Sequence, residues 1–276
     1  MESGCGEGFL ANLAPSIPRH RYTGISDFLL EFDEQSEKNA SEWFLLTDID
    51  EKVFTVGFLN TTDDTHIAFW LWVSFDPLSR LLLFKMPPSP AHEIASLTFA
   101  RLFDDSLQQI GLKYAIKQLG SSPYGEGNRG RKMADFEWAP KRPPPGHHRN
   151  APTMVLEVAL TETQSKLNSD VRFWLDQARH DVNIALTLAI GQREPRITIE
   201  KWERVDDRIH RTQKIDIHHQ GQRNTTVVTG GPLKLDFAKV FLRAPATPKE
   251  RDIVLDDEQL QFLAEEIWET QEASQR

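Results

Sequence analysis

Cysteine is nearly absent from this sequence: among 276 residues there is one, Cys5. A single thiol can form no intramolecular disulfide and no multi-cysteine zinc site. The fold must therefore be held by burial of apolar side chains, for which a chain of this length suffices. Such cysteine usage is typical of a reducing compartment, so we expect an intracellular protein of the nucleus or cytoplasm.

Positive charge is also scarce. The chain carries 32 Lys and Arg against 41 Asp and Glu, a formal net charge of -9 with neutral histidines. Non-specific affinity for nucleic acids comes mainly from cations that neutralise phosphates. This composition argues against a general polyanion binder, and any nucleic-acid site must be local.

Long hydrophobic runs are missing as well. The longest, Ile67 to Phe75, is interrupted by Ser74 and is too short to span a membrane. Residues 1–13 are acidic and rich in glycine, without a basic stretch that leads into an apolar run. We therefore expect neither a signal peptide nor a membrane partner.

Composition divides the chain into an arm, residues 1–45, and a single domain, residues 46–276. The arm mixes Gly, Pro, Ser and acidic residues with short apolar clusters, and we expect it to be loosely ordered. Short runs rich in β-forming residues, separated by turn residues, predict extra strands over 53–59, 66–75 and 80–86.

The core of the domain is predicted over residues 90 to 205. Phe99, Leu102 and Phe103 lie at helical spacing, and Gly111 stands where a helix ends, which predicts a helix over 90–110. The further expected elements are strands over 114–119, 132–138 and 153–160, a helix over 161–177, strands over 182–190 and 196–205, a hairpin over 208–229 and a terminal helix over 256–271. The order helix, three strands, helix, strand is the skeleton of an α/β sheet covered by helices.

Glu157 is a charge in an otherwise apolar strand. Alternation over 153–160 puts Met154, Leu156 and Val158 on one face and Glu157 on the other. A buried carboxylate is costly unless it is paired, hydrogen-bonded or bound to a metal. Glu157 is therefore a candidate metal ligand, with a structural ion pair as the alternative.

Asp135 is the second acid of this kind, because it also stands among apolar residues of the preceding strand. If the two strands are neighbours, Asp135 and Glu157 face one site. Two such carboxylates suit Mg²⁺, which keeps several waters and takes one or two protein carboxylates. The alternative is that Asp135 pairs with Arg131 or Lys132 at a strand end.

These residues resemble the PD-(D/E)XK nuclease-like superfamily, in particular its uncharacterised fungal members. The resemblance rests on residues 132–135, 152–159 and the helix 161–177. It implies a restriction-endonuclease-like core, a mixed sheet flanked by helices, here with extra N-terminal strands and a C-terminal helix. It also implies that Asp135 and Glu157 hold Mg²⁺ or Mn²⁺.

The sequence departs from the pattern of this superfamily at two positions. Ala134 replaces the usual proline, and Ala159 stands where a lysine normally follows the second acid by two residues. That lysine stabilises charge at the phosphate, so a substitute is needed for catalysis. In similar proteins it comes from the following helix, which makes Lys166 or Gln164 the candidate, with a solvated lysine as the alternative.

Two further features complete the predicted site. The resemblance implies an acid on the first core helix, and Glu93 matches it, although Glu93 would also favour the positive end of the helix dipole. A loop over 125–149 gathers cations that would bind a phosphate backbone, unless the loop is merely solvated. The candidate contacts are Arg129, Arg131, Lys132, Lys141 and Arg142.

Two functions follow. The first is a Mg²⁺-dependent nuclease that hydrolyses phosphodiester bonds of DNA or RNA, with Asp135, Glu157, Lys166 and Glu93 as its catalytic residues. The alternative is a catalytically degenerate nuclease fold that serves as a nucleic-acid or protein binding module. The acidic helix over 256–271 leaves a protein partner or a homodimer open.

Overall fold

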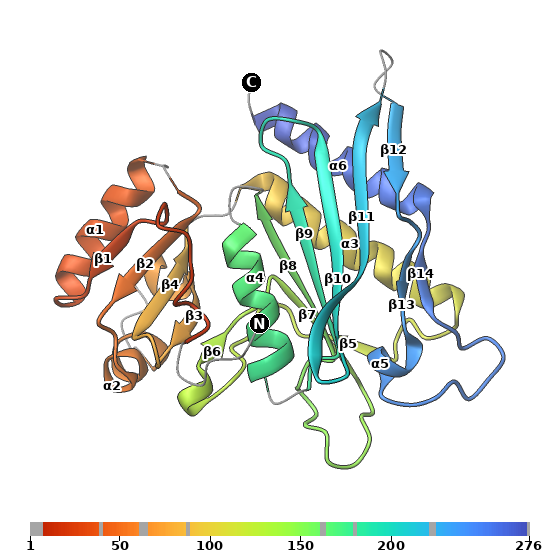
Figure 1. Cartoon of the computed structure of the whole chain (residues 1–276), viewed down its shortest axis with the longest axis horizontal. Helices are drawn as coiled ribbons and strands as arrows, with labels where there is room; N and C mark the ends of the chain where they lie inside the picture. The colour runs from red at the N-terminus through yellow and green to blue at the C-terminus, as the bar shows by residue number, and fades with distance from the viewer. Residues whose placement is uncertain are drawn as a thin grey trace. The chain divides into compact units, whose positions relative to one another are not determined.

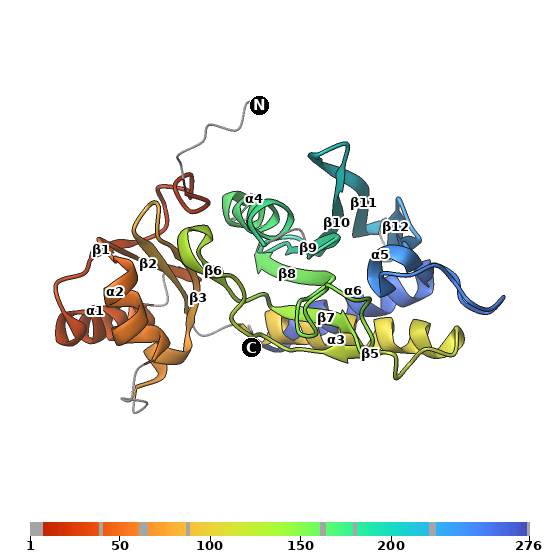
Figure 2. The same cartoon turned by 90° about the horizontal axis from the view of Figure 1, so that it is seen from below.

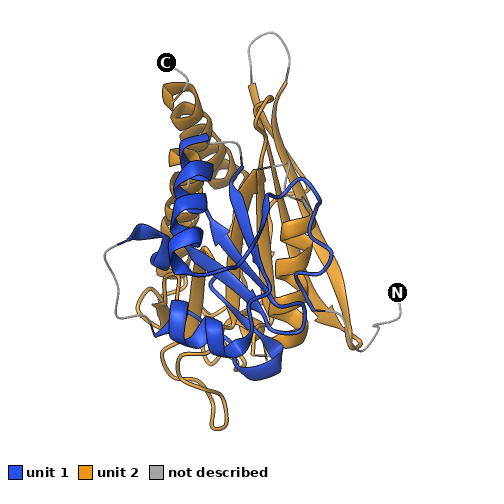
Figure 3. Ribbon diagram, turned by 90° about the vertical axis from the view of Figure 1, so that its left-hand side faces the viewer, with its two compact units in different colours: residues 1–88, 123–133 blue, residues 89–122, 134–276 orange. Residues whose placement is uncertain are grey.

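The chain folds into two compact units. A computed structural model describes residues 8–38, 41–60, 66–86, 89–160, 164–178, 181–220 and 225–274. Unit 1 is Met1–Pro88 with Pro123–Met133, and unit 2 is Ser89–Ser122 with Ala134–Arg276 (Figure 3). Among the described residues, no helix is long and apolar enough to cross a membrane.

Unit 1 is built on a five-stranded sheet with the order β1-β2-β4-β3-β6 (Figure 1). Its strands are β1 (Arg19–Arg21), β2 (Trp43–Thr47), β3 (Trp72–Asp76), β4 (Leu81–Lys85) and β6 (Arg131–Lys132). Its helices are α1 (Ile25–Lys38), α2 (Glu51–Phe54), the π-helix η1 (Thr55–Leu59), and the 3-10 helices η2 (Ile67–Trp70) and η3 (Gly127–Arg129). Extra N-terminal strands are thus present, and β4 confirms the strand expected over 80–86. The strand expected over 66–75 is wrong in its first half, which forms η2, and β3 confirms its second half.

The structure of residues 8–45 differs from the loosely ordered arm that we expected. Phe28 and Phe32, four residues apart on α1, are both buried. The ring centroid of Phe28 lies 5.0 Å from that of Phe84 of β4, and the ring centroid of Phe32 lies 6.1 Å from that of Phe44 of β2. Burying such aromatic side chains orders the helix on its sheet.

The strand predicted over 53–59 is wrong, because this segment is helical. The side chain of Asp50 accepts a hydrogen bond from Val53 N at 2.8 Å and caps α2. Phe54 and Phe58, again four residues apart, are both buried. The buried phenylalanines follow the helical period, whereas the β-forming side chains of the same segment had favoured a strand.

Unit 2 is built on a seven-stranded mixed sheet with the order β12-β11-β10-β9-β8-β7-β5. Its strands are β5 (Ile116–Gln118), β7 (Phe136–Pro140), β8 (Met154–Leu160), β9 (Ile184–Ile190), β10 (Arg196–Val205), β11 (Arg208–Gln220) and β12 (Thr225–Thr229). A separate pair, β13 (Leu233–Leu235) and β14 (Ile253–Leu255), flanks the short helix α5 (Phe237–Phe241). Sequence analysis did not find these last three elements.

Helices cover both faces of the larger sheet. Figure 2 shows α3 (Pro90–Gln109) and α6 (Asp257–Ser274) on one side of β8 and β9, and α4 (Gln164–Arg172) on the other. β8 runs antiparallel to β7 and parallel to β9, and α4 makes the crossover. The order α3, β5, β7, β8, α4, β9 confirms the predicted fold class, a mixed α/β sheet with flanking helices consistent with a restriction-endonuclease-like core.

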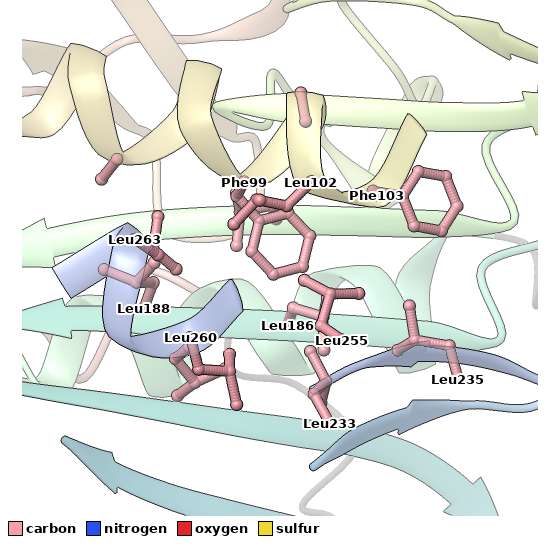
Figure 4. Close-up of a cluster of buried hydrophobic side chains, with 14 of the residues drawn as sticks. Phe99, Leu102, Phe103, Leu186, Leu188, Leu233, Leu235, Leu255, Leu260 and Leu263 are labelled. Carbon is pink, nitrogen blue, oxygen red and sulfur yellow. The ribbon is translucent and has the colours of Figure 1, made fainter. Parts of the chain in front are cut away.

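The main core of unit 2 fills the space between the sheet and the pair α3 and α6. Figure 4 shows Phe99, Leu102 and Phe103 of α3 against leucines of the strands and of α6. The even-numbered residues of β8, Met154, Leu156 and Val158, belong to this cluster. The predicted alternation of β8 is therefore confirmed, and Glu157 faces the α4 side.

Candidate functional site

Asp135 directly precedes β7, and Glu157 lies in β8, the strand that pairs with β7. In the ladder between β7 and β8, Phe136 pairs with Leu156 and Glu137 with Val155. The ladder ends at Phe136, the residue that follows Asp135. Asp135 is brought to Glu157 by a hydrogen bond from the backbone N–H of Val158, the residue that follows Glu157.

Asp135 is tied to the backbone of β8. Its Oδ2 accepts a hydrogen bond from Val158 N at 2.7 Å, and its side chain remains 13% exposed. His92 of α3 lies against the same place, with Nε2 3.3 Å from Asp135 Oδ2 and 3.1 Å from the carbonyl oxygen of Val158. These contacts hold the Asp135 carboxylate at the edge of β8, next to Glu157.

Glu157 is buried, with a side chain 2% exposed, and is held from the side of α4. The indole Nε1 of Trp174 donates to Glu157 Oε1 at 2.6 Å. The ammonium Nζ of Lys166 donates to Glu157 Oε2 at 3.4 Å. Trp174 belongs to η5 (Phe173–Gln177), a π-helical segment that directly follows α4.

Lys166 is not a solvated lysine. Its side chain is 2% exposed, and its Nζ donates to Asp170 Oδ2 at 2.6 Å. Burial acts to lower the pKa of Lys166, but the carboxylates of Asp170, Glu157 and Asp135 outweigh it and hold the pKa above its ordinary value. Lys166 therefore carries a positive charge beside the two acids. The side chain of Gln164, the other candidate, lies outside what the structure describes.

Ala159 packs where the expected lysine would stand. It is fully buried and forms a small cluster with Leu167 of α4 and Ala189 of β9. A methyl side chain at position 159 lets α4 approach the strand closely. The same helix brings Lys166, the residue before Leu167, to Glu157.

Glu93 lies in the first turn of α3, and its side chain is 55% exposed. Its Oε1 lies 3.6 Å from His92 Nδ1. The contact with Asp135 comes from His92, the preceding residue. An acid in this first turn also favours the helix dipole, the alternative considered for Glu93.

The five predicted nucleic-acid contacts are divided between the two units. Arg129, Arg131 and Lys132 belong to unit 1, where Lys132 is buried in β6. Lys141 and Arg142 are exposed and follow the end of β7, whereas Asp135 precedes its start. At about 3.4 Å per residue, Lys141 stands roughly 20 Å along the strand from Asp135. Within unit 2 the strand thus keeps this part of the basic loop away from the two acids.

Sequence reasoning missed His92, Asp170 and Trp174 as parts of this site. A signal was available for two of them, because Lys166, Asp170 and Trp174 follow one another at intervals of four residues and so share one helix face. No sequence pattern connects His92 with Asp135, since 43 positions separate them and only tertiary packing joins α3 to β8.

The donor set fits a hard divalent cation. Asp135 and Glu157 offer carboxylate oxygens, which Mg²⁺ prefers, and the partial exposure of Asp135 gives access for waters and substrate oxygens. Three carboxylates and one ammonium give Asp135, Glu157, Asp170 and Lys166 a net negative charge. In the described part of the chain, no three or more His, Cys, Asp and Glu side chains are grouped for a metal ion.

Comparisons with known proteins add little to this picture. No family model and no curated protein matches the sequence. Among solved structures, the chain is similar to a protein belonging to DUF820 from Anabaena variabilis that is provisionally assigned as a nuclease. The TM-score is 0.36 and the identity 13%, over 66% of this chain and 87% of the other. A likeness of this size carries no argument, so function rests on the side chains described above.

Proposed function

We propose that this chain is a nuclease-like protein of the PD-(D/E)XK superfamily that hydrolyses phosphodiester bonds of DNA or RNA with Mg²⁺ or Mn²⁺. One observation carries the proposal: two acids, Asp135 directly before β7 and Glu157 in β8, share a site with the buried ammonium of Lys166. This is the combination of charges that phosphodiester hydrolysis requires.

Each side chain has a definite task in this proposal. Asp135 and Glu157 would hold the ion, and the chemistry that such an ion supplies is activation of water and stabilisation of charge on the phosphate. Lys166 places a positive charge beside the acids and replaces the lysine absent at position 159. His92 fixes the Asp135 carboxylate, and Trp174 fixes that of Glu157. Glu93 would act as an auxiliary acid at the start of α3.

Substrate binding is part of the same proposal. Arg129, Arg131, Lys141 and Arg142 would contact the phosphate backbone of DNA or RNA, and the exposure of Arg129, Lys141 and Arg142 supports this. Lys132 is buried in β6 and is not proposed as a contact. The nuclear or cytoplasmic location, a protein partner and a homodimer remain predictions.

A second candidate is a degenerate nuclease fold that binds nucleic acid or protein without cleavage. The observation that favours it is the engagement of both Glu157 oxygens, one by Trp174 and one by Lys166. A buried carboxylate that is paired in this way is stable as a structural ion pair and needs no metal.

The two candidates differ in a cleavage assay on single- and double-stranded DNA and RNA with Mg²⁺ or Mn²⁺. Cleavage that Glu157→Gln abolishes and Glu200→Gln retains supports the nuclease. Glu200 is a matched control, because it is also a buried glutamate of this sheet. It lies in β10 and forms an ion pair with Arg211 of β11. Absence of cleavage in the wild type, together with binding that survives loss of both acids, would establish the degenerate module instead.

A further inference from the structure

Three side chains of one helical face converge on Glu157. Lys166 and Trp174 donate to its two carboxylate oxygens, and Asp170, midway between them in sequence, accepts from Lys166. Asp170 is fully buried and lies one helical turn from Lys166. Asp170 has no direct part in the proposed reaction.

The two bonds of the Lys166 ammonium are unequal. The distance from Nζ to Asp170 Oδ2 is 2.6 Å, whereas the distance to Glu157 Oε2 is 3.4 Å, near the limit of a hydrogen bond. Charge-assisted hydrogen bonds are strong at short range. The ammonium is therefore held chiefly by Asp170 and only weakly by Glu157.

A lysine that paired closely with Glu157 would compete with a divalent cation for the same carboxylate. Both are positive charges, and a buried carboxylate is stabilised by either one. The closer the Lys166 ammonium lies to Glu157, and the farther from Asp170, the more strongly it competes with a divalent cation for Glu157.

We propose that Asp170 is a positioning residue that holds the Lys166 ammonium back from Glu157 and keeps Glu157 available to a divalent cation. This inference rests on the proposed function, in which Glu157 is a metal ligand.

The first test measures binding of Mn²⁺ to the full chain by the electron paramagnetic resonance signal of the free ion. Asp170→Asn should weaken Mn²⁺ binding by roughly threefold or more, because Lys166 then pairs with Glu157. In the Lys166→Met background the same substitution should change binding by less than about twofold. A general loss of negative charge would instead weaken binding equally in both backgrounds, and that result would overturn the proposal.

The second test needs no metal. The Trp174 indole N–H, assigned with Trp174→Phe, reports on Glu157 in a ¹H–¹⁵N spectrum. Asp170→Asn should shift this resonance in the metal-free protein, but not in the Lys166→Met background. Asp176→Asn, an exposed acid of η5 that pairs with Arg204, is the matched control and should leave the resonance in place. An unmoved Trp174 resonance in Asp170→Asn would refute the positioning role.

The two tests separate the two proposals. If the wild type fails to bind Mn²⁺ but the Trp174 resonance shifts as expected, the metal site is refuted and the control of Lys166 by Asp170 stands. If Glu157→Gln abolishes Mn²⁺ binding and Asp170→Asn changes nothing in either test, the metal site stands and the role of Asp170 fails. If a single variant does not fold, the double variant with Lys166→Met and Asp170→Leu is tested in its place. It replaces a buried ion pair by an apolar pair, which costs little stability. This double variant should bind Mn²⁺ at least as tightly as the wild type, and weaker binding would count against the proposal.

Discussion

Asp135 Oδ2 accepts a hydrogen bond from the backbone N–H of Val158 at 2.7 Å, so one acid of the site is tied to the residue that follows the other. Strand register alone would leave the Asp135 side chain free to rotate. This bond sets its direction and couples its placement to the backbone at Glu157. Charge and geometry at Asp135 can therefore be tested separately.

Asp135→Asn should keep the fold and lose the activity. The amide oxygen still accepts from Val158 N, so the melting temperature should stay near that of the wild type. Metal-dependent cleavage should fall by about a hundredfold or more, because the negative charge is gone. Asp135→Ala should in addition lower the free energy of unfolding by about 1–3 kcal/mol, since the N–H loses its acceptor. Equal stability of the two variants in denaturant titrations would show that the bond to Val158 contributes nothing.

Lys166→Met should destabilise unit 2. It removes the ammonium between two buried carboxylates, and breaking a buried ion pair in this way costs about 3–5 kcal/mol. Lys214→Met is the control, because Lys214 pairs with Asp216 while 42% exposed, and should cost less than about 1 kcal/mol. Chemical denaturation followed by the fluorescence of the tryptophans measures both. Similar costs for the two variants would contradict the burial argument.

Ala159→Lys, which restores the residue expected at this position, should not restore function. The new side chain would enter the cluster of Ala159, Leu167 and Ala189, and overpacking of this kind costs about 1–3 kcal/mol. We expect a lower melting temperature and no gain in cleavage, whereas Ala244→Lys on an exposed loop should change neither. A more active Ala159→Lys variant would mean that Lys166 does not substitute for the missing lysine.

Acid should weaken an ion pair in the loop between α5 and β14. The Arg243 guanidinium, which donates two hydrogen bonds at 2.7 and 2.8 Å, and the Ala246 N–H lower the pKa of Glu250 to about 2, from an ordinary value of 4.5. Because the folded pKa is the lower one, this contribution to stability is present above pH 4.5 and is lost as the pH falls toward 2. A carboxyl ¹³C titration should place the Glu250 midpoint near 2. Glu250→Gln should flatten the pH dependence of stability in that window, while Glu258→Gln should not.

Much of unit 2 was predictable because its elements follow local rules. The helix over 90–110 has a capping serine, a proline in its first turn and apolar residues at helical spacing, and α3 is found there. The alternation over 153–160 predicted both β8 and the face of Glu157. Periodicity is a property of the segment itself, so sequence is enough to recognise it.

Prediction failed where packing against other segments of the chain decides the secondary structure. Residues 53–59 combine β-forming side chains with a helical spacing of phenylalanines, and burial in unit 1 selects the helix. The strand expected over 132–138 is divided, since β6 joins the sheet of unit 1 and β7 that of unit 2. No local pattern marks a chain that changes sheets at Met133.

The sequence by itself determined that Glu157 is an acid in an apolar core strand and that position 159 lacks a lysine. Only the tertiary structure decided that Lys166 turns inward to Asp170 and Glu157, and that His92 reaches Asp135. The physical reason is the difference between local and non-local energies. Helical and strand periods are set by each residue's own neighbours in the chain, whereas the orientation of a charged side chain depends on burial and on partners that folding brings together.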